Sequence, residues 1–243
     1  MAGCTLSSTR RQAVSILGAT GLPSVPTQPG ARARGLPEGG HVVLLGDSVF
    51  DNAAYVAGGP DVAAQLRRSL PPGWQAKLGA VDGAVASDVR AQLARTPAGA
   101  THLVISAGGN DALRAEAILS ERVGSVADGL GRLALARERF GEAYQAMLEP
   151  ILARGLPVAV CTIYDPRFPD RLRQRLAVAG LALFNDVIIR QAFIHRTSVL
   201  DLRLVCDEDA DFANPIEPSV QGGGKIATAI AHWVSGQTCP SAL

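Results

Sequence analysis

Ser48 stands in a local setting that suits a nucleophile. A short apolar run at residues 41–46 ends in Gly46-Asp47-Ser48, and small and polar residues follow it. A strand of a parallel α/β sheet delivers its last side chains to the carboxyl edge, where such folds bind their ligands. Ser48 is therefore a candidate to attack a carbonyl carbon. Asp and Ser are also common turn residues, so the triplet alone fits a strand followed by a turn equally well.

Two further motifs follow later apolar runs. Gly83 comes after the run at residues 75–81, and a glycine there exposes a backbone N–H that no side chain obstructs. Asn110 lies in a Gly-Gly-Asn-Asp stretch after the run at 102–107, and its amide can donate hydrogen bonds to a developing oxyanion. Each motif alone also fits a turn or a helix cap. Together they indicate an acyl-transfer site.

The elements that must position these residues alternate along the chain. Apolar runs and turn signals predict strands at 41–46, 75–81, 102–107, 157–163 and 198–205. Helical spacing of apolar residues predicts helices near 60–70, 87–95, 122–154, 168–194 and 222–235. Regular β–α alternation predicts a parallel sheet with helices on both faces, which brings the three motifs to one edge.

Composition indicates an ordinary globular chain. With 243 residues, 47% of them hydrophobic, one domain with a sizeable core is expected. A net charge of +1 gives no reason to expect nucleic acid or an anionic membrane as a partner. Asn185, Asp186 and Arg190 interrupt the most apolar late helix, so a buried or amphipathic helix is expected there, with no membrane span. Cys161 and Cys206 fit small buried thiols, and the cysteine spacing gives no zinc motif.

The motifs in this order resemble the SGNH (GDSL) hydrolase superfamily over about residues 41–236. The resemblance implies a flavodoxin-like, three-layer α/β/α fold on a mainly parallel five-stranded sheet, and hydrolysis of carboxylic esters without a cofactor or a metal. It implies that Ser48 is the nucleophile. Its own N–H, Gly83 and Asn110 would form the oxyanion hole.

The last family motif departs from the pattern. The superfamily closes with Asp-x-x-His, which supplies the histidine base and the aspartate that orients it. In residues 214–222, the Pro-Ser-x-x-Gly tail places Asn214 at the Asp position and Glu217 at the His position. A second register assigns these positions to Asp211 and Asn214, fits the tail less well and still provides no histidine.

The four histidines of the chain are not expected to replace the missing base. His41 and His102 open predicted strands, about 20 Å from the carboxyl edge at roughly 3.3 Å per residue. His195 precedes the last predicted strand, and His232 lies several turns into the final helix. All four are interpreted as core or surface residues far from Ser48.

Two functions remain open at this point. In the first, Glu217 is the base; its reference pKa of about 4.3 must then be raised by desolvation. Asp211 or Asp209 could share a proton with it, and Asp47 and Asn214 could support the site. In the second, the chain has lost hydrolysis and binds an acyl or carbohydrate ester. Both readings imply a small-molecule ester ligand and leave its acyl chain and leaving group open.

The N-terminal segment does not read as part of the fold. Arg10 and Arg11 precede a modest apolar stretch, and an Ala-x-Ala pattern follows at 31–33, as in a twin-arginine export signal. A disordered leader on a cytoplasmic protein is the alternative. The expected organisation is a leader at 1–38, a hydrolase-like domain at 39–237 and a tail at 238–243.

Overall fold

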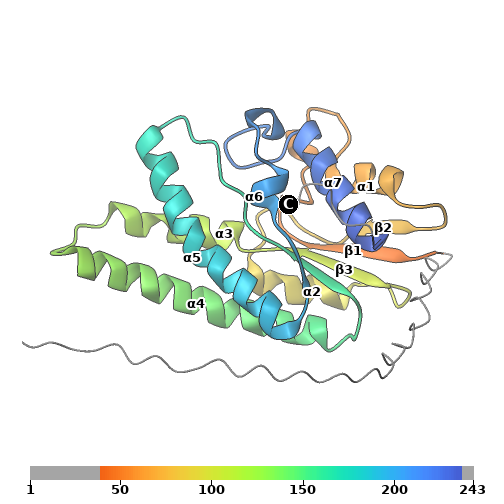
Figure 1. The fold of residues 1–243 in the computed structure, drawn as a ribbon, viewed down its shortest axis with the longest axis horizontal. Helices are drawn as coiled ribbons and strands as arrows, with labels where there is room; N and C mark the ends of the chain where they lie inside the picture. Colours follow the sequence, from red (N-terminus) through yellow and green to blue (C-terminus); the bar gives the residue numbers. More distant parts are fainter. Residues whose placement is uncertain (1–38, 237–243) are drawn as a thin grey trace, which may run out of the picture. The chain divides into compact units, whose positions relative to one another are not determined.

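The computed structural model describes residues 39–236, which form five parallel strands with helices on both sides (Figure 1). The predicted leader and the tail at 238–243 lie outside these residues. The strands are β1 (His41–Gly46), β2 (Gln75–Leu78), β3 (His102–Ser106), β4 (Val158–Cys161) and β5 (Ser198–Leu200), in the spatial order β2-β1-β3-β4-β5. This confirms the predicted three-layer α/β fold on a parallel five-stranded sheet.

The alternation of apolar side chains along β1 builds both halves of the core. Val42 and Leu44 belong to one buried cluster, and Val43 and Leu45 belong to the other. The first cluster is completed by α1 (Val62–Ser69), α6 (Leu202–Val205) and α7 (Val220–Val234). The second is completed by α2 (Val89–Ala94), α4 (Val126–Leu152) and α5 (Arg171–His195). A strand that is apolar at nearly every position is typical of a sheet covered on both faces.

The structure differs from the sequence prediction in two segments. The predicted strand at 198–205 ends at Leu200, and residues 202–205 form α6, because Asp201 accepts a hydrogen bond from the backbone N–H of Arg203 and caps that turn. The second segment is the chain at residues 109–120, for which no helix was predicted. It forms α3 (Gly109–Ala115) and the 3₁₀ helix η3 (Glu116–Ser120).

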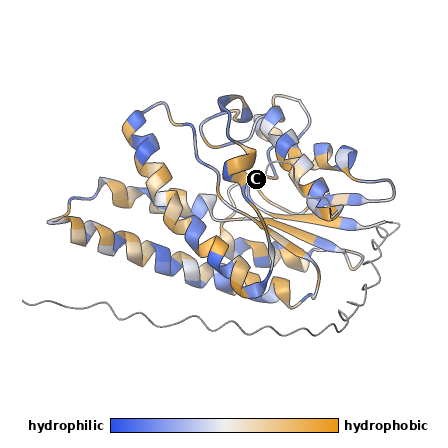
Figure 2. Ribbon diagram, viewed as in Figure 1, coloured by the Kyte–Doolittle hydropathy of each residue, from blue (hydrophilic) through white to orange (hydrophobic). Residues whose placement is uncertain are grey.

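Among the described residues, α5 alone is long and apolar enough to cross a bilayer by length and composition. Its apolar residues include Phe184, Val187 and Ile188, which are buried in the second core cluster. Figure 2 shows hydrophobic colour along α4 and α5, which run side by side in the outer layer. The apolar character of α5 is therefore at least partly that of a core helix.

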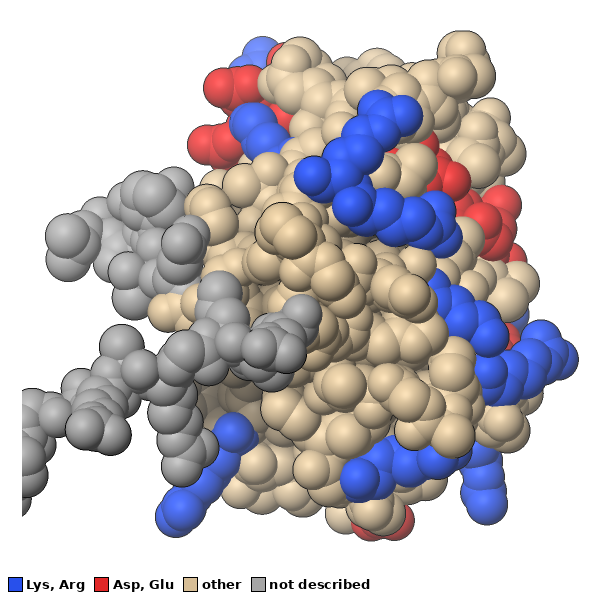
Figure 3. All heavy atoms as spheres, turned by 90° about the vertical axis from the view of Figure 1, so that its right-hand side faces the viewer, with Lys and Arg blue, Asp and Glu red and all other residues tan. Residues whose placement is uncertain are grey.

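Figure 3 views the end of the molecule at which the strands begin. Lys and Arg side chains are spread over this face, with Asp and Glu side chains among them. The polar motifs of the sequence analysis follow the other ends of β1 and β3, at the carboxyl edge of the sheet.

Candidate active site

The turn after β1 is fixed by Gly46 and Gln92. Gly46 has φ +129°, and a Cβ on it would lie 1.7 Å from the Ser106 carbonyl oxygen, so only glycine fits. The buried side chain of Gln92 donates to the Gly46 carbonyl oxygen at 2.8 Å and accepts from the Gly46 N–H at 2.7 Å. This pair of hydrogen bonds holds the residue two positions before Ser48. The sequence analysis missed Gln92, because one polar residue inside a predicted helix gives no signal.

Ser48 and Glu217 meet at the carboxyl edge although they are 169 residues apart in sequence. Ser48 Oγ donates a hydrogen bond to Glu217 Oε1 at 3.1 Å, and both residues are buried. The Glu217 carboxyl group therefore lies within hydrogen-bond distance of the Ser48 hydroxyl. A carboxylate that accepts from a serine hydroxyl has the geometry of a general base.

The surroundings of Glu217 favour its neutral form. Burial raises the pKa of Glu217 to about 7, the hydrogen bond from Ser48 lowers it, and the charge of Asp82 raises it. Glu217 Oε2 is buried and has no hydrogen-bond partner among residues 39–236. A carboxylate with a pKa of about 7 accepts a proton much more readily than an exposed glutamate.

Asn214 positions the backbone around Glu217. Its Oδ1 accepts hydrogen bonds from the N–H groups of Ile216 and Glu217, both at 3.0 Å. The Ala213 N–H in turn donates to the Glu217 carbonyl oxygen at 2.8 Å. Asn214 thus shapes the loop and makes no hydrogen bond to the Glu217 carboxyl group.

Two other segments hold the same loop. Asn52, fully buried in the turn after Ser48, donates to the Pro218 carbonyl oxygen at 3.1 Å. The Tyr164 hydroxyl donates to the Ile216 carbonyl oxygen at 2.6 Å. These contacts join segments more than fifty residues apart, which is why the sequence did not reveal them.

The idea that Asp211 or Asp209 shares a proton with Glu217 is wrong. Asp211 is buried and accepts from Lys225 Nζ at 2.9 Å. Burial alone would raise the pKa of Asp211, but the Lys225 ammonium and further hydrogen bonds lower it. Asp209 is exposed and forms an ion pair with Arg167. Each of these carboxylates therefore pairs with a cation of its own, and neither forms a hydrogen bond with Glu217.

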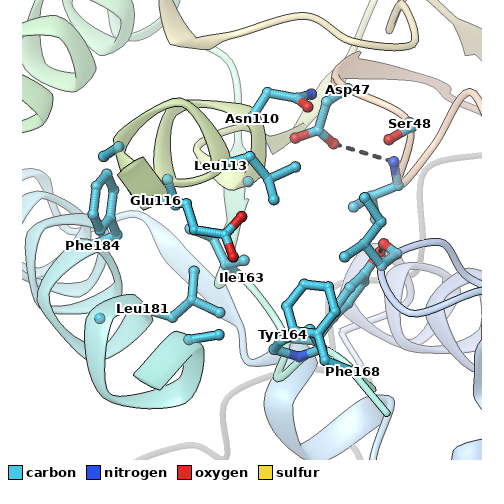
Figure 4. A pocket seen from close by; sticks show the side chains of 18 of the residues that line it. Asp47, Ser48, Asn110, Leu113, Glu116, Ile163, Tyr164, Phe168, Leu181 and Phe184 are labelled. Atoms are coloured by element: carbon cyan, nitrogen blue, oxygen red, sulfur yellow. Dashed lines mark hydrogen bonds between the residues drawn. The ribbon is translucent and has the colours of Figure 1, made fainter. Parts of the chain in front are cut away.

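Asp47 is a second buried carboxyl group at this edge. Its Oδ1 accepts from the Val49 N–H at 3.2 Å (the dashed line in Figure 4) and from Ser106 Oγ at 3.3 Å. Burial, and to a smaller extent the charge of Glu217, raise the pKa of Asp47 to about 7, although its hydrogen bonds lower it. Two carboxyl groups with pKa values near 7 carry fewer than two charges at neutral pH.

The two oxyanion candidates differ in placement. Asn110 lines the same cavity as Ser48, and its Nδ2 donates to the Ala84 carbonyl oxygen at 2.9 Å. An amide nitrogen carries two hydrogens, so one remains for a ligand. Gly83 lies in an exposed turn with φ +76° and is not among the residues that line the cavity. Its oxyanion role stays a prediction.

The histidines lie where the sequence placed them. His41 and His102 begin β1 and β3. The His102 ring packs against two tryptophans, with ring centroids 5.1 Å from Trp74 and 5.4 Å from Trp233. Among residues 39–236 there is no cluster of His, Cys, Asp or Glu that could hold a metal ion.

An apolar cavity of about 110 Å³ opens beside Ser48. In Figure 4, Asp47, Ser48 and Asn110 lie on one side of it, and Leu181 and Phe184 of α5 lie on the opposite side. The arrangement combines a serine, a partly desolvated carboxylate and an amide donor at the end of an apolar chamber. It can support nucleophilic attack on an ester whose acyl group enters the chamber.

The comparisons with known proteins agree with this picture. The model of the GDSL-like Lipase/Acylhydrolase family matches residues 44–222. An extracellular lipase from Streptomyces rimosus is 20% identical with a TM-score of 0.59, covering 82% of this chain and 100% of that one. A phospholipase A1 from Streptomyces albidoflavus is 18% identical with a TM-score of 0.56, covering 79% and 98%. A lipase/acylhydrolase from Enterococcus faecalis is 19% identical with a TM-score of 0.56, covering 84% and 100%. No curated protein sequence matches this chain.

Proposed function

The chain belongs to the GDSL-like lipase/acylhydrolase family, and on that premise we propose that it is a serine esterase in which Glu217 replaces the histidine base. Family membership supports ester hydrolysis as the general activity. The hydrogen bond from Ser48 Oγ to Glu217 Oε1 carries the assignment of the two roles. It joins the family's nucleophile position to the position where the histidine is missing.

In the first step, Glu217 removes the proton from Ser48 Oγ as that oxygen attacks the ester carbonyl carbon. The serine proton moves to Glu217 Oε1 over the 3.1 Å hydrogen bond. The negative charge of the base moves to the former carbonyl oxygen. The site therefore keeps one negative charge throughout, and the carboxyl group becomes neutral in surroundings that favour the neutral form.

The oxyanion is stabilised by donors that are in place before the reaction. Asn110 Nδ2 has a hydrogen left after its bond to Ala84. The Ser48 N–H has no acceptor among the described residues, which supports its role as a second donor. Preorganised donors of this kind stabilise charge without reorganisation during the step.

The intermediate then collapses and the enzyme is regenerated. The neutral Glu217 gives its proton to the leaving alkoxide oxygen as the ester C–O bond breaks, leaving an acyl group on Ser48. Water attacks this acyl-enzyme while Glu217 accepts the water proton. The carboxylic acid departs as Ser48 regains its own proton from Glu217.

The experiment that tests this proposal compares four forms of the full chain. The wild type should hydrolyse p-nitrophenyl butyrate and react with a fluorophosphonate probe, and Ser48→Ala should do neither. Glu217→Gln keeps the side-chain shape but cannot accept a proton, and it should lower kcat about 10²–10⁴-fold. Glu142→Gln, at an exposed site on α4, is the control and should leave kcat unchanged. A Glu217→Gln variant as fast as the wild type would refute the assignment of the base.

One observation favours a second candidate function. In the family pattern an aspartate orients the base, whereas Glu217 Oε2 has no partner among the described residues. A site without an orienting group could bind an ester without cleaving it. If the wild type neither turns over p-nitrophenyl butyrate nor reacts with the probe, yet binds ethyl butyrate, this second function holds.

A further inference from the structure

From the walls of the apolar cavity we infer that the ligand is an ester of an aliphatic acid of about four to six carbons, whose chain lies against Gly180. The inference rests on the proposed function, because it assigns the acyl group to the chamber beside Ser48. Gly180 would set the chain length that the chamber accepts.

The polar groups of the cavity are concentrated near Ser48. Asp47, Ser48, Asn110 and Glu217 lie at the carboxyl edge, whereas α4 and α5 contribute only apolar residues and glycine to the lining. Figure 4 shows the hydrophobic side chains of Leu181 and Phe184 on the side opposite Ser48, together with Glu116. A sugar would leave its hydroxyl groups unpaired there, at a cost of about 1–3 kcal/mol each. This lining favours an aliphatic chain over a carbohydrate.

The three other polar side chains of the lining, Ser106, Glu116 and Tyr164, already have partners. The Ser106 hydroxyl donates to Asp47 Oδ1 at 3.3 Å. Glu116 forms hydrogen bonds with Arg173 at 2.7 Å and 3.0 Å, and the Arg173 guanidinium stacks 3.8 Å from the Phe168 ring centroid. The Tyr164 hydroxyl is taken by the Ile216 carbonyl oxygen. Neither Glu116 nor Tyr164 therefore needs a polar group from the ligand.

Small residues on the facing helices create the space. Ala136 of α4 and Ala177 and Gly180 of α5 line the cavity. A Cβ added to Gly180 would meet no heavy atom within 4 Å. Glycine inside a helix is destabilising by about 0.5–1 kcal/mol relative to alanine. Since Gly180 faces the cavity, a side chain there would project into the room that an acyl chain needs.

The volume indicates the length of the chain. A cavity of about 150 Å³ lined by Leu, Ile and Phe binds benzene, which has six carbons. The cavity beside Ser48 measures about 110 Å³. Scaled by volume against the cavity that binds the six carbons of benzene, this cavity holds about four carbons beyond the ester carbonyl. Butanoyl to hexanoyl esters should therefore be preferred over acetyl esters.

The test varies acyl length and wall size together. The ratio of kcat/KM for p-nitrophenyl hexanoate over acetate is measured for the wild type, Gly180→Leu and Gly131→Leu. Gly131 is the matched control: it is an exposed glycine on α4, outside the cavity lining, whose added Cβ would also meet open space. Each buried methylene favours binding about fourfold, so the wild-type ratio should exceed about ten. Gly180→Leu should lower that ratio at least about tenfold, and Gly131→Leu should not change it.

Binding measurements separate this inference from the proposed function. In Ser48→Ala, ethyl hexanoate should bind more tightly than ethyl acetate, and the added Gly180→Leu change should remove the difference. If no form hydrolyses any ester but this binding pattern holds, the esterase proposal fails and the acyl cavity stands. If esters are hydrolysed and Gly180→Leu behaves as Gly131→Leu does, the esterase proposal stands and the acyl cavity is refuted. Thermal unfolding of both leucine variants at or above the wild-type temperature shows that they fold.

Discussion

Replacing Glu217 by Gln should remove part of the pH dependence of stability as well as the activity. Burial raises the pKa of Glu217 from 4.5 to about 7 in the folded protein. Between these two values the folded chain binds more protons than the unfolded chain, so the free energy of unfolding falls as the pH rises. The contribution of Glu217 to the free energy of unfolding is fully present below about pH 4.5 and fully lost above about pH 7. Gln does not titrate, so this loss disappears in the variant.

The size of the effect follows from the same values. Each pKa unit corresponds to about 1.4 kcal/mol, so the difference between 4.5 and about 7 gives about 3 kcal/mol as an upper bound. The cavity beside the carboxyl group admits solvent, which screens the charge and reduces the expected effect to about 1–2 kcal/mol. Asp47 adds to this effect of pH on the free energy of unfolding. Its pKa is also raised, in part by the charge of Glu217.

The assay is urea unfolding followed by circular dichroism, near pH 5 and near pH 8.5. Near pH 5 most of the loss has not yet occurred, so Glu217→Gln should lie close to the wild type there, and it should exceed the wild type by about 1–2 kcal/mol at the higher pH. Glu142→Gln, on exposed α4 surface, should follow the wild type at both. The reasoning is refuted if Glu217→Gln is no more stable than the wild type at the higher pH, because the ionised carboxylate would then cost nothing to bury.

Three further outcomes are expected. Asn110→Ala should lower kcat about 10²–10³-fold with little change in thermal stability, as steady-state kinetics and calorimetry would show; an unchanged kcat would exclude it from the oxyanion hole. Gln92→Ala leaves the buried N–H and carbonyl of Gly46 without partners and should lower the free energy of unfolding in urea by about 2–4 kcal/mol. A change below about 1 kcal/mol would contradict the role given to these two hydrogen bonds. For a twin-arginine leader, Arg10→Lys with Arg11→Lys should keep the precursor inside the cell, and N-terminal sequencing that finds Met1 or Ala2 on the wild-type cellular protein would contradict export.

The sequence predicted the sheet well, because both halves of the core depend on local patterns. The run at 41–46 is apolar at nearly every position, which indicates a strand buried on both faces. The error at 202–205 arose because alternating apolar residues fit a short helical turn and a strand equally well. The cap that decides between them involves Asp201, and a single aspartate is too common to be a signal.

The candidate site could be predicted only where its residues sit in local motifs. Ser48 and Asn110 follow strands, and Glu217 was located by its spacing to the glycine of the following helix. Gln92, Asn52 and Tyr164 hold the site through contacts across the chain, which no local pattern encodes. The proton-sharing role of Asp211 failed because its partner Lys225 lies 14 residues further along, in α7, and the spacing of the two residues did not reveal the contact.

The replacement of Asp and His by Asn214 and Glu217 conserves charge, which explains how one site could keep its chemistry. A neutral histidine beside an aspartate carries one negative charge before the reaction, and the pair becomes neutral overall when the histidine takes a proton. Glu217 beside a neutral Asn214 also carries one negative charge and also becomes neutral. An aspartate at 214 would add a second negative charge to a region where burial already raises the pKa of Glu217 and Asp47 to about 7. In the proposed mechanism Glu217 therefore combines the proton acceptor and the counter-charge in one side chain, and Asn214 keeps only the task of holding its backbone.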